Sequence, residues 1–347
     1  MDGKNQDRRN SRVTIRDVAK EAGVSQSTVS HFLNHTASLS LETKQRIRDA
    51  IKKLHYRPHL VARNFKKRRT ASLGLLVPDI TNLFYAELSR GVADAAREKG
   101  YSVILYSTSY QGEMERGFVD LIEQGQVDGV VVSYSLIEES LWNRLFDCEV
   151  PLVLVDIYPF TSRCPSVVMD NEKGMEMAID YLHGLGHTNI AYLGEPPYVL
   201  TLVKRQRSFL ASMQKRGLSV RENWVLVGEE TQLNRVEVGF SLGKLLLENR
   251  FLPTAVVASS DLVAIGAMKA LLSAGMKIPE DISVVGFDDI LLASYFHPSL
   301  TTIRQPKYEM GKMGVELLLK LVEGESAFQN ALLEPVLVER NSCRRFP

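Results

Sequence analysis

Cysteine is scarce in this sequence of 347 residues, which holds only Cys148, Cys164 and Cys343. Three widely spaced thiols form neither a disulfide framework nor a zinc-binding cluster, so they predict a reducing, cytoplasmic environment and no structural metal. Long apolar runs are also missing, and none approaches the ~18 residues that a transmembrane helix requires. The first residues, MDGKNQDRRNSR, are too polar for a secretory signal peptide. We therefore expect a cytoplasmic protein with no membrane partner.

The whole chain has no large excess of positive or negative charge, since its net charge is +1. Positive and negative residues are nevertheless distributed unevenly along it. Residues 1–70 contain 17 Lys and Arg against 6 Asp and Glu, a net charge of +11, whereas the remainder contains 25 against 35, a net charge of −10. A small basic segment on a large acidic body predicts a polyanionic partner for the basic segment alone. A solvated basic surface is the alternative that charge by itself leaves open.

The segment VTIRDVAKEAGVSQSTVSHFLN, residues 13–34, predicts two short helices joined by a tight turn. Thr14 and Asp17 have the spacing of a capping box. Gly23 suits a left-handed helix end, and Ser25 can cap the second helix. A further apolar stripe with helical spacing follows and predicts a third helix. Two helices joined by a glycine turn and supported by a third form a helix-turn-helix unit.

The second helix of this unit carries uncharged hydrogen-bonding side chains on its expected outer face. They are Gln26, Ser27, Thr28, Ser30 and His31. Side chains of this kind can recognise base edges, while the Lys and Arg residues around them hold phosphates. A three-helix bundle with an ordinary polar surface is the alternative.

The segment RPHLVARNFKKRRT, residues 57–70, offers about two helical turns after Pro58 and then four consecutive basic residues. A helix this short is marginal in water, because nucleation fixes several dihedral angles for one hydrogen bond. The segment therefore needs an external surface against which Phe65 and its other apolar side chains can pack.

From Ser72 onward, short apolar runs alternate with helical stretches. The first group is SLGLLVPD, YSVILYST, VDGVVVSY and PLVLVD, and the second is SVVMD, NIAYLGE, TAVVASS and ISVVGFD. Continuous β-branched runs of this length are typical of strands buried on both faces. The alternation predicts an α/β fold with two doubly wound parallel sheets. Ligands of such folds bind in the crevice beyond the carboxyl ends of the strands.

Motifs for enzymatic chemistry are weak in this body. GFSLG, residues 239–243, has the pattern of a hydrolase nucleophile elbow, but it lies in a stretch with helical rather than strand periodicity. His183 and His187 are four residues apart without the glutamate of a zinc-binding helix. No glycine-rich phosphate loop follows a strand. The sequence therefore predicts a protein that is not an enzyme and uses no cofactor or metal, with an α/β hydrolase as a remote alternative.

The stretches TIRDVAKEAGVSQSTVSHFLN, HYRP and VAR resemble the signature of the lac repressor family of bacterial transcription regulators, and the resemblance covers essentially residues 13–340. It implies a two-lobed core like that of periplasmic sugar-binding proteins, with the chain passing between lobes near 165–168, 295–298 and 328–331. The implied domains are a flexible basic tail (1–12), a helix-turn-helix head (13–57), a hinge helix (58–70) and an effector-binding core (71–347). Within the core, the N-lobe is expected at about 71–166 and 297–329, and the C-lobe at about 167–296 and 330–347.

The resemblance also implies a homodimer that binds a pseudo-palindromic operator in double-stranded DNA. Gln26, Ser27 and His31 are then expected to contact bases in the major groove. The expected contacts to the DNA backbone are Thr14, Ser25, Thr28, Ser30, Arg63, Lys66, Lys67, Arg68 and Arg69. Paired hinge helices would insert Phe65 into the minor groove, where the family usually has leucine. A Phe65 that packs on the core domain, beside a solvated basic linker, is the alternative.

Effector contacts are expected at strand ends and neighbouring loops of the core. The matching positions are Asn82, Phe84, Tyr85, Asp156, Arg205, Ser260 and Asp288. Among these, Arg205 and Asp288 are the strongest candidates, whereas Asp261 is expected to cap a helix. The expected ligand is a small polar metabolite, a sugar or a sugar derivative. Control by a partner protein in place of a metabolite is the alternative that the sequence leaves open.

Overall fold

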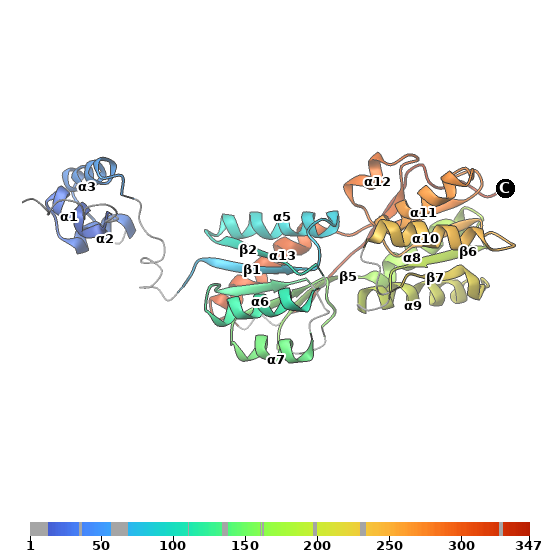
Figure 1. The fold of residues 1–347 in the computed structure, drawn as a ribbon, viewed down its shortest axis with the longest axis horizontal. Coiled ribbons are helices and arrows are strands. Elements are labelled where there is room, and N and C mark those ends of the chain that lie inside the picture. The colour runs from blue at the N-terminus through green and yellow to red at the C-terminus, as the bar shows by residue number, and fades with distance from the viewer. Residues whose placement is uncertain are drawn as a thin grey trace, which may run out of the picture. The chain divides into compact units, whose positions relative to one another are not determined.

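The protein is described from a computed structural model, which covers residues 13–34, 37–56, 69–109, 111–133, 138–159, 161, 163–196, 200–229, 234–325 and 329–347. The chain forms two compact units, residues 1–70 and residues 71–347 (Figure 1). Among the described residues, every helix is too short or too polar to cross a membrane.

The first unit is the expected helix-turn-helix head. Its helices are α1 (Ile15–Ala22), α2 (Gln26–Asn34) and α3 (Leu41–Lys53). The capping box of Thr14 and Asp17 is present at the start of α1, and Gly23 ends this helix with a φ of 63°. A small core closes the three helices, and its buried members are Val18, Ala19, Ala22, Val29, Ile47 and Ala50. The predicted helix-turn-helix architecture is therefore confirmed.

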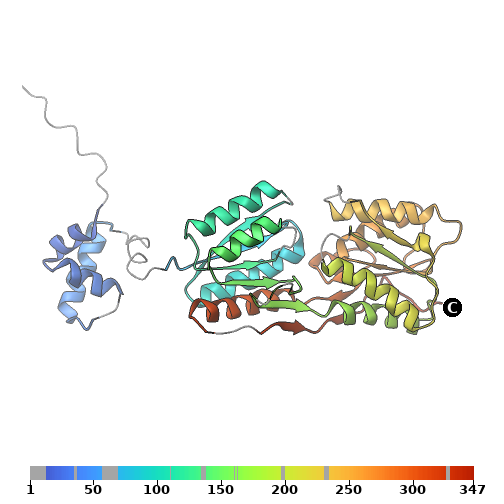
Figure 2. The same cartoon turned by 90° about the horizontal axis from the view of Figure 1, so that it is seen from below.

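The second unit contains two lobes, each built on a six-stranded sheet (Figures 1 and 2). The N-lobe sheet has the order β11-β5-β4-β3-β1-β2, with every pair parallel. Its strands are β1 (Ser72–Val77), β2 (Ser102–Ser107), β3 (Gly129–Val132), β4 (Leu152–Val155), β5 (Ser166–Met169) and β11 (Ala331–Leu333). Helices α5 (Leu83–Glu98) and α13 (Lys307–Val322) cover one face, and α6 (Gly112–Glu123) and α7 (Glu139–Asp147) cover the other.

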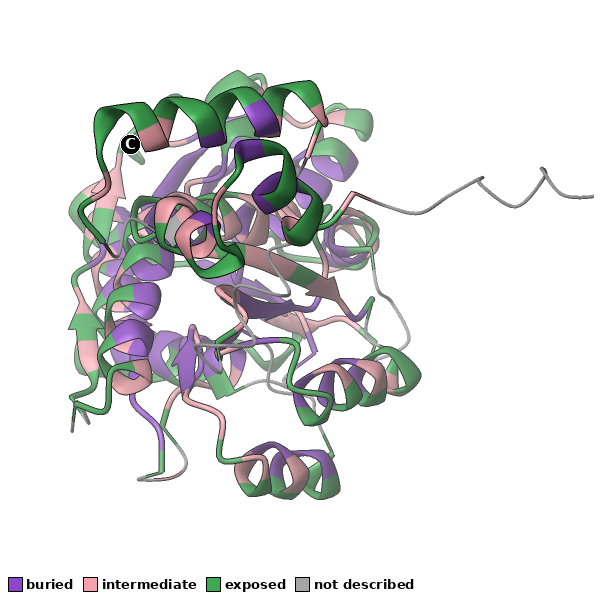
Figure 3. Ribbon diagram, turned by 90° about the vertical axis from the view of Figure 1, so that its left-hand side faces the viewer, coloured by how far each residue is buried: buried purple, intermediate pink, exposed green. Residues whose placement is uncertain are grey.

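The C-lobe sheet has the order β12-β10-β9-β8-β6-β7, and only the β10–β12 pair is antiparallel. Its strands are β6 (Ile190–Gly194), β7 (Val225–Val227), β8 (Ala255–Ala258), β9 (Ser283–Asp288), β10 (Thr301–Arg304) and β12 (Val336–Val338). Helices α8 (Asn171–Gly184) and α9 (Leu200–Lys215) pack on one face, and α10 (Arg235–Leu247) and α11 (Asp261–Ser273) on the other. A short helix, α12 (Leu291–Tyr295), follows β9. Figure 3 shows the buried strands enclosed by helices whose outer faces are exposed.

The predicted lobe boundaries are wrong by several residues. The chain leaves the N-lobe sheet after β5, returns after β10, and leaves again after β11, so the crossings lie at 170, 305–306 and 334–335. Strand β10 therefore belongs to the C-lobe and not to an N-lobe segment beginning at 297, and β11 belongs to the N-lobe. Neither strand is a buried apolar run, because β10 is Thr-Thr-Ile-Arg and β11 is a short edge strand with Leu332 exposed, so local periodicity does not reveal which sheet each joins.

Candidate functional site

The exposed face of α2 is fixed by a serine cap. Ser25 Oγ accepts a hydrogen bond from Thr28 N at 3.0 Å and shares hydrogen bonds with Thr28 Oγ1 at 2.7 Å and Ser27 Oγ at 2.6 Å. Gln26, Ser27 and His31 are exposed, as expected for side chains that contact bases. The cap satisfies an amide that the helix leaves unpaired, and it therefore orients the beginning of α2.

The turn before α2 is held from α3 by Arg46, a residue that the sequence analysis missed. Arg46 Nη2 donates to Ala22 O at 2.6 Å and to Gly23 O at 3.1 Å. These are carbonyls at the end of α1, where a positive charge is favoured by the helix dipole. An ion pair between Lys53 Nζ and Glu21 Oε1, at 2.6 Å, adds a second link between α3 and α1.

The other predicted DNA contacts are scattered along the described chain or lie outside it. Thr14 is exposed and bonded to Asp17 in the capping box, which lowers the pKa of the Asp17 carboxyl, and Arg69 is exposed. Thr28 and Ser30 are half-buried on α2. Outside the described residues lie Arg63, Phe65, Lys66, Lys67 and Arg68.

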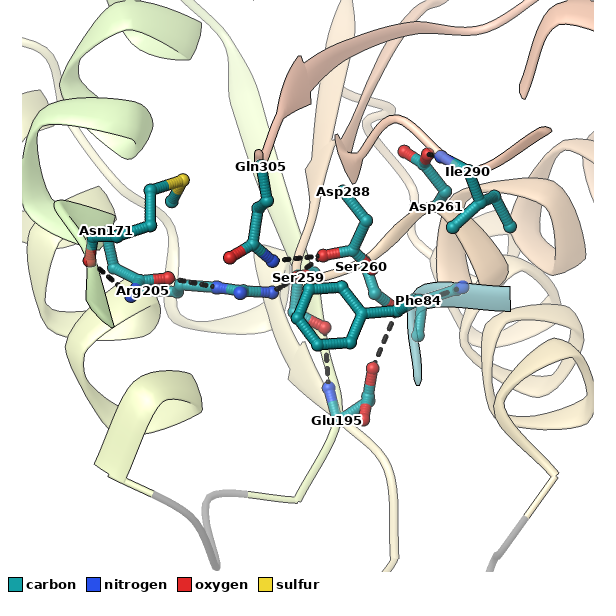
Figure 4. Close-up of polar contacts among 12 residues, drawn as sticks. Phe84, Asn171, Glu195, Arg205, Ser259, Ser260, Asp261, Asp288, Ile290 and Gln305 are labelled. Carbon is teal, nitrogen blue, oxygen red and sulfur yellow. Dashed lines mark hydrogen bonds and ion pairs between the residues drawn. The ribbon is translucent and has the colours of Figure 1, made fainter. Parts of the chain in front are cut away.

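A polar cluster surrounds Arg205 at the carboxyl ends of the C-lobe strands (Figure 4). Arg205 is buried, and its Nε donates to Asn171 Oδ1 at 2.7 Å. Its Nη1 donates to Ser259 O at 2.7 Å and lies 3.4 Å from Asp288 Oδ1. The guanidinium also lies over the Phe287 ring, 4.0 Å from its centroid, in cation–π geometry. The predicted pair of Arg205 and Asp288 is therefore in contact.

Two carboxyls near Arg205 have raised pKa values. Burial raises the pKa of Asp288 to about 6, against the opposing effects of Arg205 and of the hydrogen bond that Gln305 Nε2 donates to Asp288 Oδ1 at 2.6 Å. Burial likewise raises the pKa of Asp156 to about 7, with Arg205 lowering and Asp288 raising it. Within the described residues, the buried atoms Asp156 Oδ1 and Gln305 Oε1 have no hydrogen-bond partner. Buried polar atoms are normally paired, so these two acceptors suit a ligand that brings donors.

Ser260 takes the capping role that the sequence suggested for Asp261. Ser260 is the N-cap of α11, and its Oγ donates to Glu195 Oε1 at 2.7 Å. Asp261 does not cap the helix, because its carboxylate accepts from Ile290 N at 2.8 Å and from Thr302 Oγ1. The prediction that Asp261 is an N-cap is therefore wrong, since its side chain is directed into the core and not back toward the helix start.

Glu195 is a buried acidic residue of this cluster that the sequence analysis missed. Its Oε2 lies 2.9 Å from Arg235 Nε, and both side chains are almost fully enclosed. Asn171 and Gln305 were missed as well. All three follow strands β6, β5 and β10 within one or two residues, so a search for polar residues at every strand end would have found them.

Of the four N-lobe candidates, Asp156 directly follows β4, and the other three lie at the start of α5. Asn82 is the N-cap, and its side-chain oxygen accepts from Phe84 N at 3.0 Å. Phe84 is buried, and Tyr85 is half-buried with its ring edge-on to Phe84 at a centroid distance of 4.9 Å. Asn82 thus has a local structural role, while the aromatic pair provides an apolar surface. Within the described residues, no group of three or more His, Cys, Asp or Glu side chains could hold a metal ion.

A helix-turn-helix head joined to a two-lobed α/β core with a buried polar cluster at its strand ends defines a ligand-responsive DNA-binding protein. Residues 14–59 match the family described as bacterial regulatory proteins, lacI family, and residues 179–343 match the periplasmic binding protein-like domain. The chain is 35% identical over 333 residues to the HTH-type transcriptional repressor PurR of Vibrio cholerae serotype O1 (strain M66-2), covering 95% of this chain and 98% of that protein. It is 36% identical over 334 residues to PurR of Vibrio parahaemolyticus serotype O3:K6 (strain RIMD 2210633), covering 96% and 99%.

Solved structures show the same likeness. The lac repressor dimer bound to operator and the anti-inducer ONPF has a TM-score of 0.86 at 27% identity, covering 96% of this chain and 100% of that one. The complex of the transcriptional regulator CelR with cellobiose has a TM-score of 0.72 at 28% identity, covering 95% and 100%. The chain belongs to the lacI family of bacterial regulatory proteins. It is a DNA-binding transcriptional repressor with an effector-binding core and not an enzyme, as are the repressors and regulators named above.

Proposed function

We propose that this chain acts in the cytoplasm as a homodimer on a pseudo-palindromic operator, with α2 of each protomer in a major groove. The observation that carries this proposal is the exposed, uncharged face of Gln26, Ser27 and His31 on a segment whose net charge is +11. Hydrogen-bonding side chains without charge discriminate bases, and the surrounding cations supply affinity that does not depend on sequence. Two-fold symmetry of a dimer matches the symmetry of such an operator.

The remaining DNA contacts follow from the family resemblance. Thr14, Ser25, Thr28, Ser30 and Arg69 would contact the DNA backbone. The positions outside the described residues would act beside the head, with Arg63, Lys66, Lys67 and Arg68 at phosphates and Phe65 as the minor-groove wedge.

The proposed effector is a small neutral molecule with several hydrogen-bond donors, bound at the cluster around Arg205 and Asp288. The unpaired acceptors Asp156 Oδ1 and Gln305 Oε1 support a ligand that donates. The nearby carboxylates balance Arg205 and Arg235, so the cluster offers no surplus of positive charge to a phosphate or carboxylate ligand. A sugar meets these requirements through its hydroxyls, and a purine base meets them through its N–H groups. The names of the similar repressors make the purine base worth testing beside the sugar.

Two measurements test this function. Selection from random double-stranded DNA should enrich a palindromic site for the full chain, and failure to enrich any site would contradict the DNA-binding role. A thermal-shift screen with hypoxanthine, guanine, ribose and cellobiose should then identify a stabilising class, because a ligand at 100 times its Kd stabilises by about 2.7 kcal/mol. The ligand found must also change operator affinity, since coupling of this kind is typically about 1–3 kcal/mol. If none of the four compounds stabilises the chain, the effector proposal fails while the DNA-binding role stands.

A further inference from the structure

Lys307 is enclosed by the protein to a degree that is unusual for a lysine. It is the first residue of α13, in the N-lobe, yet only 2% of it is exposed. Its Nζ donates to Asp288 O at 2.6 Å and to Asp289 O at 3.0 Å, both from the C-lobe, and lies 3.3 Å from Glu87 Oε2 on α5. An ammonium has three donors, and a buried one persists only when they are satisfied.

Lys307 Nζ also donates to Gln305 O at 3.4 Å, but its two shorter bonds are to carbonyls of a strained turn. Asp288 has a φ of 123° and Asp289 a φ of 55°. Residues other than glycine rarely adopt positive φ values of this kind. Such a conformation persists only where its surroundings hold it. Here one ammonium donates hydrogen bonds to both carbonyls, and it thereby stabilises a backbone shape that directs the Asp288 side chain toward Arg205 (Figure 4).

The contact of Lys307 with Glu87 connects it to two tightly packed helices of the N-lobe. Glu87 lies on α5, which packs against α13 so closely that a Cβ on Gly91 would stand 2.1 Å from Tyr308 O. A Cβ on Gly311 would likewise stand 2.3 Å from Leu88 O. Helices in such close backbone contact move together, because neither can shift without a clash. Lys307 therefore joins the Asp288–Asp289 turn to two helices that are packed as one unit.

We propose that Lys307 is a positioning residue that holds the Asp288–Asp289 turn of the effector site and couples this turn to α5 through Glu87. The positioning of an effector contact rests on the function proposed for Asp288. The link between the turn and α5 does not, because it depends only on the contacts of Lys307 with Asp288, Asp289 and Glu87.

The first test is hydrogen exchange of the ligand-free full chain, with Lys307→Met compared with the matched control Lys312→Met, which replaces an exposed lysine of the same helix. The amides of Asp289 and Ile290 are hydrogen-bonded to Thr302 Oγ1 and Asp261 Oδ2, so they report on the turn. Lys307→Met should speed their exchange at least about tenfold and should also speed exchange in the first turns of α5, whereas Lys312→Met should change neither. Equal exchange in the two variants would overturn the proposal. Faster exchange at the turn without any change in α5 would overturn the coupling.

A second test needs no change at Lys307. Acetylation of the wild-type chain by an N-hydroxysuccinimide ester should modify Lys307 at least about tenfold more slowly than Lys312. Glu87→Gln should increase the labelling of Lys307, because it removes the charge on the more open side of the ammonium. Equal labelling of Lys307 and Lys312 in the wild type, or an unchanged rate in Glu87→Gln, would contradict the link. These readouts involve no effector, so they stand even if hypoxanthine, guanine, ribose and cellobiose all fail to bind.

Discussion

Arg205 Nη1 lies 3.4 Å from Asp288 Oδ1 in an ion pair whose side chains are only 5% and 7% exposed. This distance is longer than the 2.7 Å bonds from Arg205 to Asn171 and Ser259, and longer than the 2.6 Å bond from Gln305 to Asp288. Each member of the pair is thus held mainly by other groups. A ligand that contacts both residues does not need to break a short ion pair, which lowers the cost of binding.

Replacement of Arg205 by Ala is expected to abolish the response to effector while leaving operator binding intact. Loss of the guanidinium leaves the Asp288 carboxyl buried without its cation, so the core should also lose about 3–5 kcal/mol of stability. Thermal shift with the stabilising sugar or purine and operator titration by fluorescence anisotropy measure the two effects. Arg207→Ala, at an exposed position of the same helix, is the control. A normal effector response in Arg205→Ala would remove this residue from the site.

Replacement of Asp156 by Asn is expected to stabilise the ligand-free core more at alkaline than at acid pH. The unfolded chain loses the Asp156 proton near the ordinary pKa of 3.8, whereas burial raises the pKa in the folded chain to about 7. The folded state therefore binds more protons between these values, so the contribution of this group to the free energy of unfolding falls as pH rises from about 4 to about 7. Asparagine cannot ionise, so the variant does not lose this contribution to the free energy of unfolding as pH rises.

Thermal denaturation of wild type and Asp156→Asn at about pH 4.5 and about pH 8 measures this effect. The difference in Tm between the two proteins isolates this carboxyl from all other titrating groups. A difference of the same size at both pH values would show that the carboxyl is not perturbed.

Most of the fold could be predicted because burial leaves a clear record in the sequence. Runs such as GVVV and LVLV are apolar throughout, as strands covered on both faces must be, and Gly23 marks its turn by a conformation that other residues resist. The sequence carries no comparable signal for the lobe to which a strand belongs. Strand β11 pairs with β5, which lies far earlier in the chain, whereas β10 pairs with its sequence neighbour β9. For both β10 and β11, the predicted crossing lies before the strand and the actual crossing lies after it.

The site was predictable only in part for a related reason. Arg205 and Asp288 could be assigned from the family resemblance, and the structure places them in contact. The residues that complete the cluster, Asn171, Glu195 and Gln305, follow three strands that are distant in sequence. Their convergence depends on strand order and on where the chain crosses between lobes, neither of which local periodicity reveals.

Replacement of His31 by Ala is expected to reduce affinity for the selected operator by about 1–3 kcal/mol and to leave affinity for random DNA unchanged. The reason is that His31 is exposed on the face of α2 proposed to contact bases. Titration of both DNAs at one salt concentration measures the ratio. Gln45→Ala, at an exposed position of α3, should change neither affinity. An equal loss of affinity for both DNAs would indicate that His31 contacts the DNA backbone and not the bases.

Replacement of Gly23 by Ala is expected to destabilise the head more than Gly217→Ala destabilises the core. The two glycines have nearly the same φ, 63° and 66°, so both variants incur about 1–2 kcal/mol for a left-handed alanine. At Gly217 the added Cβ meets nothing within 4 Å, whereas at Gly23 it would stand 2.5 Å from Arg46 Nη2. The guanidinium must then move away from the carbonyls of Ala22 and Gly23, with a further loss of about 1 kcal/mol or more.

Hydrogen exchange of the slowest amides in each unit gives the two free energies of opening. The double variant Gly23→Ala with Arg46→Met separates the two causes, because it keeps the strained φ and removes the crowding guanidinium. If the crowding is real, Gly23→Ala should cost less in the Arg46→Met background than in the wild type, and the difference is the coupling between the two residues. Equal costs in both backgrounds would show that Arg46 does not brace the turn that carries α2, and the exposed face of α2 would then have to be oriented by the Ser25 cap alone.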